Sequence, residues 1–513
     1  MRLGIYLGSR LAVLIHPSAL RGHIRSVREL QVAVAVWRLV WGAGGWRVQL
    51  CSTRLGWMTT PPETRFEEIR KREEGLHRTL SSAQLAMIAI GGAIGTGLFL
   101  GSSFAISFAG PSVLVSYAIG AVIALLLMGC MAEMTVAHPT AGSFGAWAEF
   151  YVSPLAGFLV RYAYWAGVVF ALGTEVTAVA VYMRYWFPGV AGWVWISGFT
   201  ALLVLVNAIN VRIFGWVEYL FSSIKVFAIV AFLLLGTVFL LHSGIGLKHY
   251  SRPFFAHGFG GMWVAVLVSL FSFFSIETIA VAAGEAKDPE RAITQAFRAT
   301  MLRLALFYLL TLAIILAIVP WQVTAAGGQQ SPFVTVMAAT RIPYAAAIVN
   351  AVILIAALSA MNSQLYVATR MMFSLARGGS APRVLGTLTK SGVPVYALLV
   401  STIGIAFATL LNLRFHDRSF LILLSIAIFG PMFTWLMIFV THLRFRQRHA
   451  GKSLPFQMWG YPYTSLLGAG LMLAALLTTP FTAAFKPTLA YGVPLLIILT
   501  AAYLLRRQAV PKS

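Results

Sequence analysis

Residues 90–99 read Ile90-Gly91-Gly92-Ala93-Ile94-Gly95-Thr96-Gly97-Leu98-Phe99, with four glycines within seven positions of an otherwise apolar stretch. Glycine weakens a helix because it loses the most conformational freedom when it is ordered, so this cluster lets the chain unwind. In a bilayer, freed backbone groups are tolerated only where they face protein or a wet cavity. The stretch predicts a broken membrane helix beside a cavity. The alternative is that the small residues only let another helix approach closely.

The composition places this stretch in a membrane protein. Of the 513 residues, 59% are hydrophobic and 10% are charged, whereas soluble domains carry about 25% charged residues. The mean hydropathy is +0.83. This balance excludes a soluble enzyme and favours one polytopic membrane unit. The two cysteines, Cys51 and Cys130, are too few for a disulfide framework.

From Ser81 onward, apolar segments long enough to cross a bilayer recur with short polar breaks between them. We predict an all-α membrane protein with twelve transmembrane helices. The spans are expected near residues 81–101, 111–132, 157–186, 193–211, 217–241, 261–284, 299–320, 343–368, 395–412, 419–441, 463–480 and 488–505.

The basic excess is explained by topology. The formal net charge is +23, and cytoplasmic loops of membrane proteins accumulate Lys and Arg. If the tail before the first span lies inside, the inner connections and tails hold 22 Lys and Arg against 7 in the outer connections. We therefore expect both termini in the cytoplasm, and we expect no nucleic-acid partner.

The first 57 residues differ from the rest of the chain. They hold eight Arg and one acid, Glu29, and their apolar pieces are too short to span a membrane. We interpret 1–57 as an extension without packed structure, with translation beginning at Met58; a transit-peptide-like segment is the alternative. The other expected parts are a cytoplasmic tail at 58–80, a ten-helix transport core at 81–441, two additional helices at 442–505 and a cytoplasmic tail at 506–513.

A second interruption lies in the sixth span, at Phe271-Ser272-Phe273-Phe274-Ser275-Ile276-Glu277. This span is five helices after the first. The two spans therefore correspond if residues 81–241 and 261–441 are two repeats of inverted topology. Paired interruptions in corresponding spans mark the binding site of many transporters.

Three ionisable residues lie well inside predicted spans: Glu175, Lys225 and Glu277. Such a group costs at least ~2.5 kcal/mol at the bilayer centre, so a function is the default hypothesis. Lys225 lies about nine residues, some 13 Å, from the predicted inner end of its helix. It is therefore either a structural lysine, which snorkels or pairs with a carboxylate, or a proton carrier. Glu277 could contact substrate, relay a proton or pin the unwound chain, whereas Glu175 reads as a polar contact between helices.

Acidic residues at the cytoplasmic ends of the spans have a simpler interpretation. We expect Glu133, Glu285 and Asp288 to be solvated there, with a gating network as the alternative.

Ordered motifs over residues 80–505 resemble the amino acid permeases of the amino acid, polyamine and organocation superfamily, in the bacterial amino-acid-transporter branch. Each motif alone is weak, whereas the ordered set is specific. The motifs are 90–99 followed by Ala109-Gly110-Pro111, Glu133-Met134-Thr135 with 139–144, Ser222-Ser223-Ile224-Lys225-Val226, Gly284-Glu285-Ala286-Lys287-Asp288-Pro289, and Ser359-Ala360-Met361-Asn362-Ser363 with Tyr366 and Arg370.

The resemblance implies a leucine-transporter-type fold of ten core helices plus two, with substrate between the broken first and sixth spans. It assigns the substrate carboxylate to the chain at Ile94, Gly95, Thr96 and Gly97. Backbone carbonyls near Phe271, Phe273, Phe274 and Ser275 would take the ammonium, beside Glu277, and Phe271 or Phe274 would form an aromatic gate. It further implies Lys225, with Glu277, as the proton-coupling group and Asn362 and Ser363 as lining of an ion-like position. One departure is Phe274-Ser275, where relatives often have glycine, and it puts the substrate identity in doubt.

The resulting hypothesis is a secondary transporter that imports an α-amino acid across the cytoplasmic membrane together with a proton, with no cofactor, metal or catalytic residue. Its partners are the amino acid, the proton and the lipid bilayer. An amino acid exchanger and a polyamine or γ-aminobutyrate carrier are alternatives. A membrane enzyme is disfavoured because no HExxH or paired in-membrane His occurs, and a channel because no charged ring pattern appears. The side chain of the substrate and the oligomeric state stay open.

Overall fold

The computed structural model describes residues 62–72, 74–243, 253–287, 305–326, 331–414, 419–449, 454 and 456–509. The chain divides into two compact units, 1–62 and 63–513, and almost all of the described residues belong to the second. Regular structure in these ranges is helical, apart from one isolated bridge between Leu80 and Ala286. This confirms the all-α prediction. The predicted extension, residues 1–57, lies outside the described residues.

Ten helices in the described ranges are long and apolar enough to span a membrane. Two shorter apolar helices, Ala305–Ile318 and Val395–Leu411, lie where the seventh and ninth spans are predicted. Residues 299–304 of the predicted seventh span are outside the described part, and the count of twelve stays a prediction. The ten are Ser82–Phe99, Gly101–Ala137, Pro154–Arg184, Gly192–Ile209, Val211–His242, Gly258–Glu285, Ala345–Arg377, Phe420–Arg448, Tyr463–Phe481 and Lys486–Arg506.

The predicted break in the first span is confirmed. Helix α5 (Ser82–Ala93) begins with a capping box in which the side chains of Ser81 and Gln84 bond each other's backbone amides. It ends before Ile94, whose φ of −84° and ψ of 87° are not helical. The chain resumes as α6 (Thr96–Phe99) and α7 (Gly101–Ala109), and α8 (Val113–Ala137) follows after a short 3₁₀ turn.

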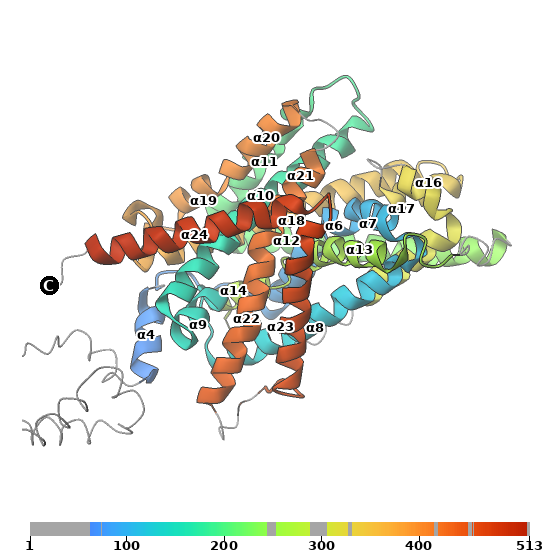
Figure 1. The fold of residues 1–513 in the computed structure, drawn as a ribbon. Helices are drawn as coiled ribbons and strands as arrows, with labels where there is room; N and C mark the ends of the chain where they lie inside the picture. The colour runs from blue at the N-terminus through green and yellow to red at the C-terminus, as the bar shows by residue number, and fades with distance from the viewer. Residues whose placement is uncertain are drawn as a thin grey trace, which may run out of the picture. The chain divides into compact units, whose positions relative to one another are not determined.

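The sixth span is broken in the same way. Helix α13 (Gly258–Phe273) ends at Phe273, and α14 (Thr278–Ala282) begins after a nonhelical segment. The two broken spans pack as halves, since α13 contacts α6 and α7 while α14 contacts α5. Figure 1 shows α13 beside α7 and α8. Both interruptions therefore meet within the protein.

Two long helices surround the breaks. Helix α10 (Pro154–Arg184) starts at an N-cap, Ser153, and packs along α18 (Ala345–Arg377). It also contacts α20 (Ile403–Arg414), α21 (Ser419–Ala427) and α22 (Phe429–Arg448). Most of α10 and the C-terminal half of α18 are buried. Side chains from these helices complete the site.

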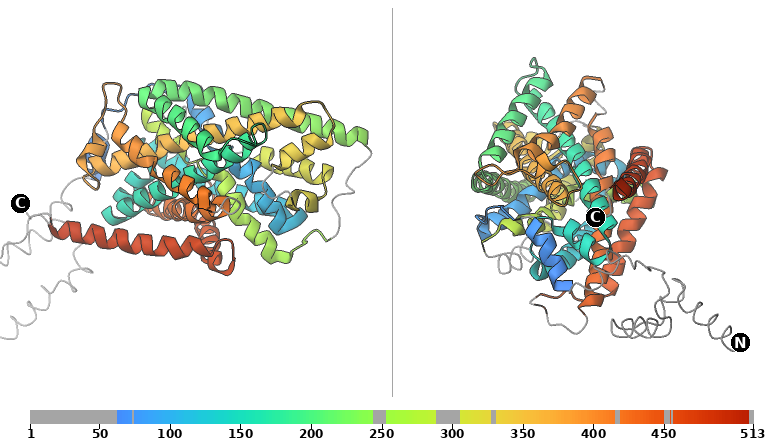
Figure 2. Two further views of the ribbon diagram at one scale, coloured as in Figure 1. Left: turned by 90° about the horizontal axis from the view of Figure 1, so that it is seen from above. Right: turned by 90° about the vertical axis from the view of Figure 1, so that its left-hand side faces the viewer.

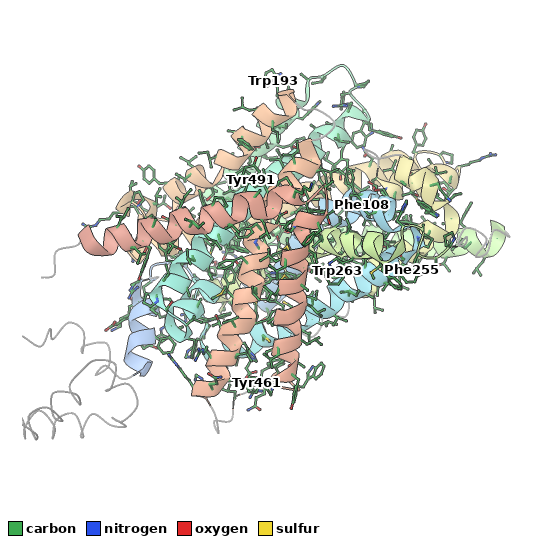
Figure 3. All side chains as sticks on the ribbon, viewed as in Figure 1. Phe108, Trp193, Phe255, Trp263, Tyr461 and Tyr491 are labelled. Carbon is green, nitrogen blue, oxygen red and sulfur yellow. The ribbon has the colours of Figure 1, made fainter. Side chains whose placement is uncertain are left out.

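Other helices cover the outside of this unit. Apolar side chains are exposed on α11 (Gly192–Ile209), α12 (Val211–Ser243) and α24 (Lys486–Ala509), among them Leu205, Phe227 and Ile497. The views in Figure 2 show α24 along the outside of the helical unit. In Figure 3, Trp193 and Tyr491 lie on the outer helices, and both are largely exposed. Large apolar side chains exposed on these outer helices fit contact with lipid.

Candidate functional site

A small cavity of about 20 Å³, room for about one water molecule, lies between the two breaks. Among the predicted substrate-binding residues, six line it: Gly95, Gly97, Phe271, Phe274, Ser275 and Glu277. Ile94, Thr96 and Phe273 are buried but do not line it. The remaining lining residues are Gly92, Ala93, Val168, Ala171, Glu175, Gln364, Ala427 and Pro431.

The glycines of the first break are required by close packing. A Cβ on Gly97 would lie 2.7 Å from Ser272 Cα, so α6 approaches the backbone of α13 directly. A Cβ on Gly95 would lie 2.8 Å from Ala360 Cβ and 2.9 Å from Glu175 Oε1. The glycine cluster therefore both breaks the helix and lets neighbouring helices approach closely. Both interpretations of its sequence apply.

The amide that the first break frees is already bound. The Thr96 N–H donates to Glu175 Oε2 at 3.3 Å. Glu175 was predicted as a polar contact between helices. It does connect α10 to the first span, but its partner is the unwound backbone.

Carbonyls freed by the two breaks share one donor. The Tyr308 hydroxyl lies 2.8 Å from both Ala93 O and Ser272 O, so it links the two broken spans. Phe273 packs against this tyrosine, with ring centroids 4.7 Å apart, and points away from the cavity. Phe271 and Phe274 face the cavity, and the Phe274 ring meets Trp435 edge-on at 5.0 Å.

Glu277 anchors the unwound segment of the sixth span. Its carboxylate accepts hydrogen bonds from Tyr164 Oη at 2.6 Å, Trp435 Nε1 at 3.1 Å and the Ser275 amide at 3.2 Å. These three donors fill most of the hydrogen-bonding capacity of the carboxylate. Of the predicted alternatives for Glu277, this arrangement corresponds to pinning the unwound chain. Ser275 itself has a φ of 74°, a left-handed conformation that favours glycine.

Lys225 lies farther from the start of its helix than predicted. Helix α12 begins at Val211, fourteen residues before Lys225, so the ammonium is about 21 Å along the helix rather than some 13 Å. Its Nζ donates to Gly91 O at 2.5 Å and Ile94 O at 2.8 Å. The side chain is fully buried, so it does not snorkel. Its partners are the carbonyls at the first break.

Besides Glu175, Lys225 and Glu277, Glu218 is a buried ionisable group near the first break, and the sequence analysis missed it. Its carboxylate accepts from Asn362 Nδ2 at 2.9 Å, Ser222 Oγ at 3.4 Å and the Ser359 hydroxyl. A Cβ on Gly91 would lie 2.1 Å from Glu218 Oε1. Glu218 and Lys225 therefore both approach the chain at Gly91.

The missed signal is a spacing. Glu218, Ser222 and Lys225 lie at positions i, i+4 and i+7, on one face of a helix. The predicted span began at 217 and left Glu218 at its edge, whereas α12 begins at Val211.

The two residues predicted to line an ion-like position lie on α18. Asn362 bridges Glu218 and Asn207, whose Nδ2 donates to Asn362 Oδ1 at 2.8 Å. Ser363 faces the first break, since a Cβ on Gly92 would lie 3.6 Å from Ser363 Cβ. In the described ranges, no three His, Cys, Asp or Glu side chains gather as metal ligands.

Acidic residues at the ends of the spans are buried in ion pairs, so the expectation of solvation is wrong for two of them. Glu285 pairs with Arg370 at 2.8 Å and accepts from Tyr366 Oη at 2.6 Å. Glu133 lies 2.9 Å from Arg446 and 3.0 Å from His442 Nε2. Asp288 lies outside the described residues.

Comparison with known proteins places the fold and the motifs in one family. The family model described as amino acid permease matches residues 84–507. The chain is 34% identical over 446 residues to the uncharacterised amino acid permease YtnA of Bacillus subtilis (strain 168), which covers 85% of this chain and 96% of YtnA.

Two further relatives are similar at the same level. Amino-acid permease RocE of Bacillus subtilis (strain 168) is 36% identical over 444 residues, 83% of this chain and 94% of RocE. The aromatic amino acid transport protein AroP of Escherichia coli (strain K12) is 36% identical over 454 residues, 86% of this chain and 98% of AroP. All three relatives are matched over nearly their whole length.

Proposed function

This chain belongs to the amino acid permease family, and from that premise we propose that it imports an α-amino acid across the cytoplasmic membrane together with a proton. Family membership confirms the predicted resemblance and makes the chain a multi-pass membrane transporter rather than an enzyme. The basic bias of the predicted inner connections supports an orientation with both termini in the cytoplasm.

The substrate is proposed to bind in the cavity between the two breaks. Its carboxylate would take the amides of Gly95, Thr96 and Gly97, and its ammonium would lie near the sixth-span break beside Phe271 and Phe274. An ammonium close to aromatic faces gains about 1–2 kcal/mol when it is desolvated. Because Glu175 binds the Thr96 amide in this structure, substrate binding there requires Glu175 to move.

The single observation that carries proton coupling is the pair of bonds from Lys225 to Gly91 O and Ile94 O. The protonated amine holds the first break against α12, and the Glu218 carboxylate also lies beside Gly91. A neutral amine lacks the positive charge that strengthens these two hydrogen bonds, so losing the proton would loosen the break. Proton release and movement of the first span would thereby be linked.

Uptake into proteoliposomes tests this proposal. Wild-type protein should show saturable uptake of a labelled amino acid that rises when the outside is acidic and falls with a proton uncoupler. Lys225→Ala should lose pH-driven accumulation because the ammonium that bonds the break is gone. Lys486→Ala, an exposed lysine at the start of α24, is the matched control and should behave as wild type.

Two outcomes would contradict the proposal in different ways. Flux that rises linearly with concentration in the wild type would indicate a channel. Undiminished pH-driven accumulation by Lys225→Ala would remove Lys225 from the coupling mechanism but leave amino acid transport in place.

A further inference from the structure

We propose that Gln364 determines substrate specificity, and that its amide selects amino acids whose side chain carries a primary amide. This inference rests on the proposed function, because it concerns the side chain of the transported amino acid. The sequence does not single out Gln364; it points to its neighbours Asn362 and Ser363 as lining of an ion-like position. Gln364 lines the cavity, whereas Asn362 and Ser363 do not.

The position of Gln364 on α18 directs it to the substrate. Ala360 lies one turn earlier on the same face and would touch a Cβ on Gly95 at 2.8 Å. Gln364 therefore faces the first break, and the same cavity is lined by Phe274 and Ser275 of the sixth-span break. A substrate held between the two breaks meets the Gln364 side chain.

Gln364 is buried but has an unused polar atom. The side chain is 5% exposed, and its Oε1 has no hydrogen-bond partner within the described ranges. The two carboxylates that line the same cavity are engaged, Glu277 by three donors and Glu175 by the Thr96 amide. A buried polar group without a partner is costly, and such groups in native proteins call for an explanation. A bound ligand that completes the hydrogen bonds is the explanation that fits a cavity wall.

The chemistry of the glutamine amide defines its best partner. A carboxamide offers an acceptor oxygen and two N–H donors, so another carboxamide satisfies both kinds of site at once. A hydrocarbon side chain would leave the Gln364 amide desolvated and unpaired, and a site built for hydrogen bonding rejects such a ligand. Val168, Ala171, Ala427 and Pro431 form an apolar wall that suits the methylene part of a side chain.

Competition for uptake tests this assignment. Full-length protein in proteoliposomes is given radiolabelled glutamine, with unlabelled glutamine, asparagine, leucine, phenylalanine, lysine and glutamate as competitors. In the wild type, glutamine and asparagine should compete best. Gln364→Met keeps the approximate size and removes the hydrogen bonds, so glutamine should bind about 10-fold more weakly or worse relative to leucine.

Two comparisons separate recognition from folding. Gln322→Leu changes an exposed glutamine on α16 (Trp321–Ala326) and should keep the wild-type order of competitors. Gln364→Glu keeps the shape but replaces the N–H donors with a carboxylate, so it should also lose the preference for amides. The readout is the ratio of apparent affinities for the competitors, because a general loss of stability would lower the uptake of all substrates together.

The failure of this inference differs from failure of the proposed function. If leucine or phenylalanine outcompetes glutamine in the wild type, or if Gln364→Met keeps the wild-type order, Gln364 does not select amides, although transport stands. The wild-type order decides even where a variant does not fold. If folded wild-type protein takes up no labelled amino acid saturably, the proposed function itself is wrong.

Discussion

Single residues explain why the sequence predicts the two breaks but not all of the side chains that surround them. Glycine clusters and an intramembrane acid are local signals, and they indicated the first break and Glu277. Spacing puts Glu218 on the same helix face as Lys225, but the role of Glu218, like that of Gln364, depends on tertiary contacts. Their importance depends on contact with Gly91 and with the cavity, which lie far away along the chain. Helix spacing alone shows that a residue shares a face, and it does not show what that face meets.

Ser275 carries a prediction at the scale of one residue. Its φ of 74° lies in the left-handed region, which costs a non-glycine residue about 1–2 kcal/mol. Ser275→Gly should therefore keep or slightly raise the midpoint of thermal unfolding in detergent. Ser275→Val should lower the midpoint, because a β-branched residue is strongly disfavoured at positive φ.

Thermal unfolding of the purified protein measures both variants. Ser272→Val is a helical comparison in the same span, where valine does not meet a positive φ. Equal midpoints for Ser275→Gly and Ser275→Val would contradict the idea that backbone strain is stored at this break.

The helix bounds show that the predicted spans lie at the right positions but end too early at polar helix ends. The predicted spans matched the positions of the long helices, because hydropathy follows the bilayer thickness. The bounds were set by apolarity, so polar helix ends were cut off. Helix α8 continues to Ala137 and carries buried Glu133, and α12 begins at Val211 and carries buried Glu218.

Helix α4 (Pro62–Arg72) shows a contact that composition could not predict. The sequence predicts only a cytoplasmic tail here, yet Phe66 packs on the His138 ring at 4.2 Å and Arg72 pairs with Glu149 at 3.0 Å. Glu149 also pairs with Arg161 at 2.9 Å. The apolar and charged contacts together fix the described tail to α9 (Ser143–Tyr151) and the end of α8.

This contact should weaken in acid. Burial, with a smaller effect of His449, lowers the pKa of His138 from 6.5 to about 4. Burial alone would raise the pKa of the Glu149 carboxyl, but the Arg161 and Arg72 guanidiniums hold it below its usual range. Both pKa values are lower in the packed state, so the packed state binds fewer protons than the detached state. The contribution of His138 to the stability of the α4 contact is present above pH 6.5 and is lost as the pH falls from 6.5 to about 4. The contribution of Glu149 is lost as the pH falls through its lowered pKa.

Hydrogen exchange of the backbone amides of residues 63–72 measures this loss. Exchange corrected for the intrinsic pH effect should quicken between pH 6.5 and pH 4. His138→Phe keeps a ring beside Phe66 and should remove the part of the dependence that His138 causes. Constant protection of 63–72 across this window would show that His138 and Glu149 do not control the attachment of α4.

The molecule as a whole ties the two broken spans together at one end. Leu80 precedes the first span, and its N–H donates to Glu285 O at 3.1 Å while its carbonyl accepts from the Lys287 amide at 3.1 Å. The Glu285 carboxylate in turn binds Arg370 of α18 through two bonds, at 2.8 and 3.1 Å. The beginning of the first span, the end of the sixth and α18 are thus joined by one buried cluster. If this end is the cytoplasmic one, as the charge bias predicts, access from inside requires the cluster to separate.

Glu285→Gln should therefore favour the inward-open state. Removing one partner of a buried ion pair costs about 3–5 kcal/mol, and even half of that changes a closed-to-open ratio more than 10-fold. The measurement is the rate at which a membrane-impermeant thiol reagent labels a cysteine at the cavity-lining Ala93, in inside-out vesicles and in a background with Cys51→Ser and Cys130→Ala. Glu285→Gln should label faster than its parent, whereas Glu67→Gln, an exposed change on α4, should not. Equal labelling rates in the parent, Glu285→Gln and Glu67→Gln would mean that this cluster stabilises the fold without controlling access. The link between the two breaks would then have to lie at Tyr308, which bonds Ala93 O and Ser272 O beside the cavity.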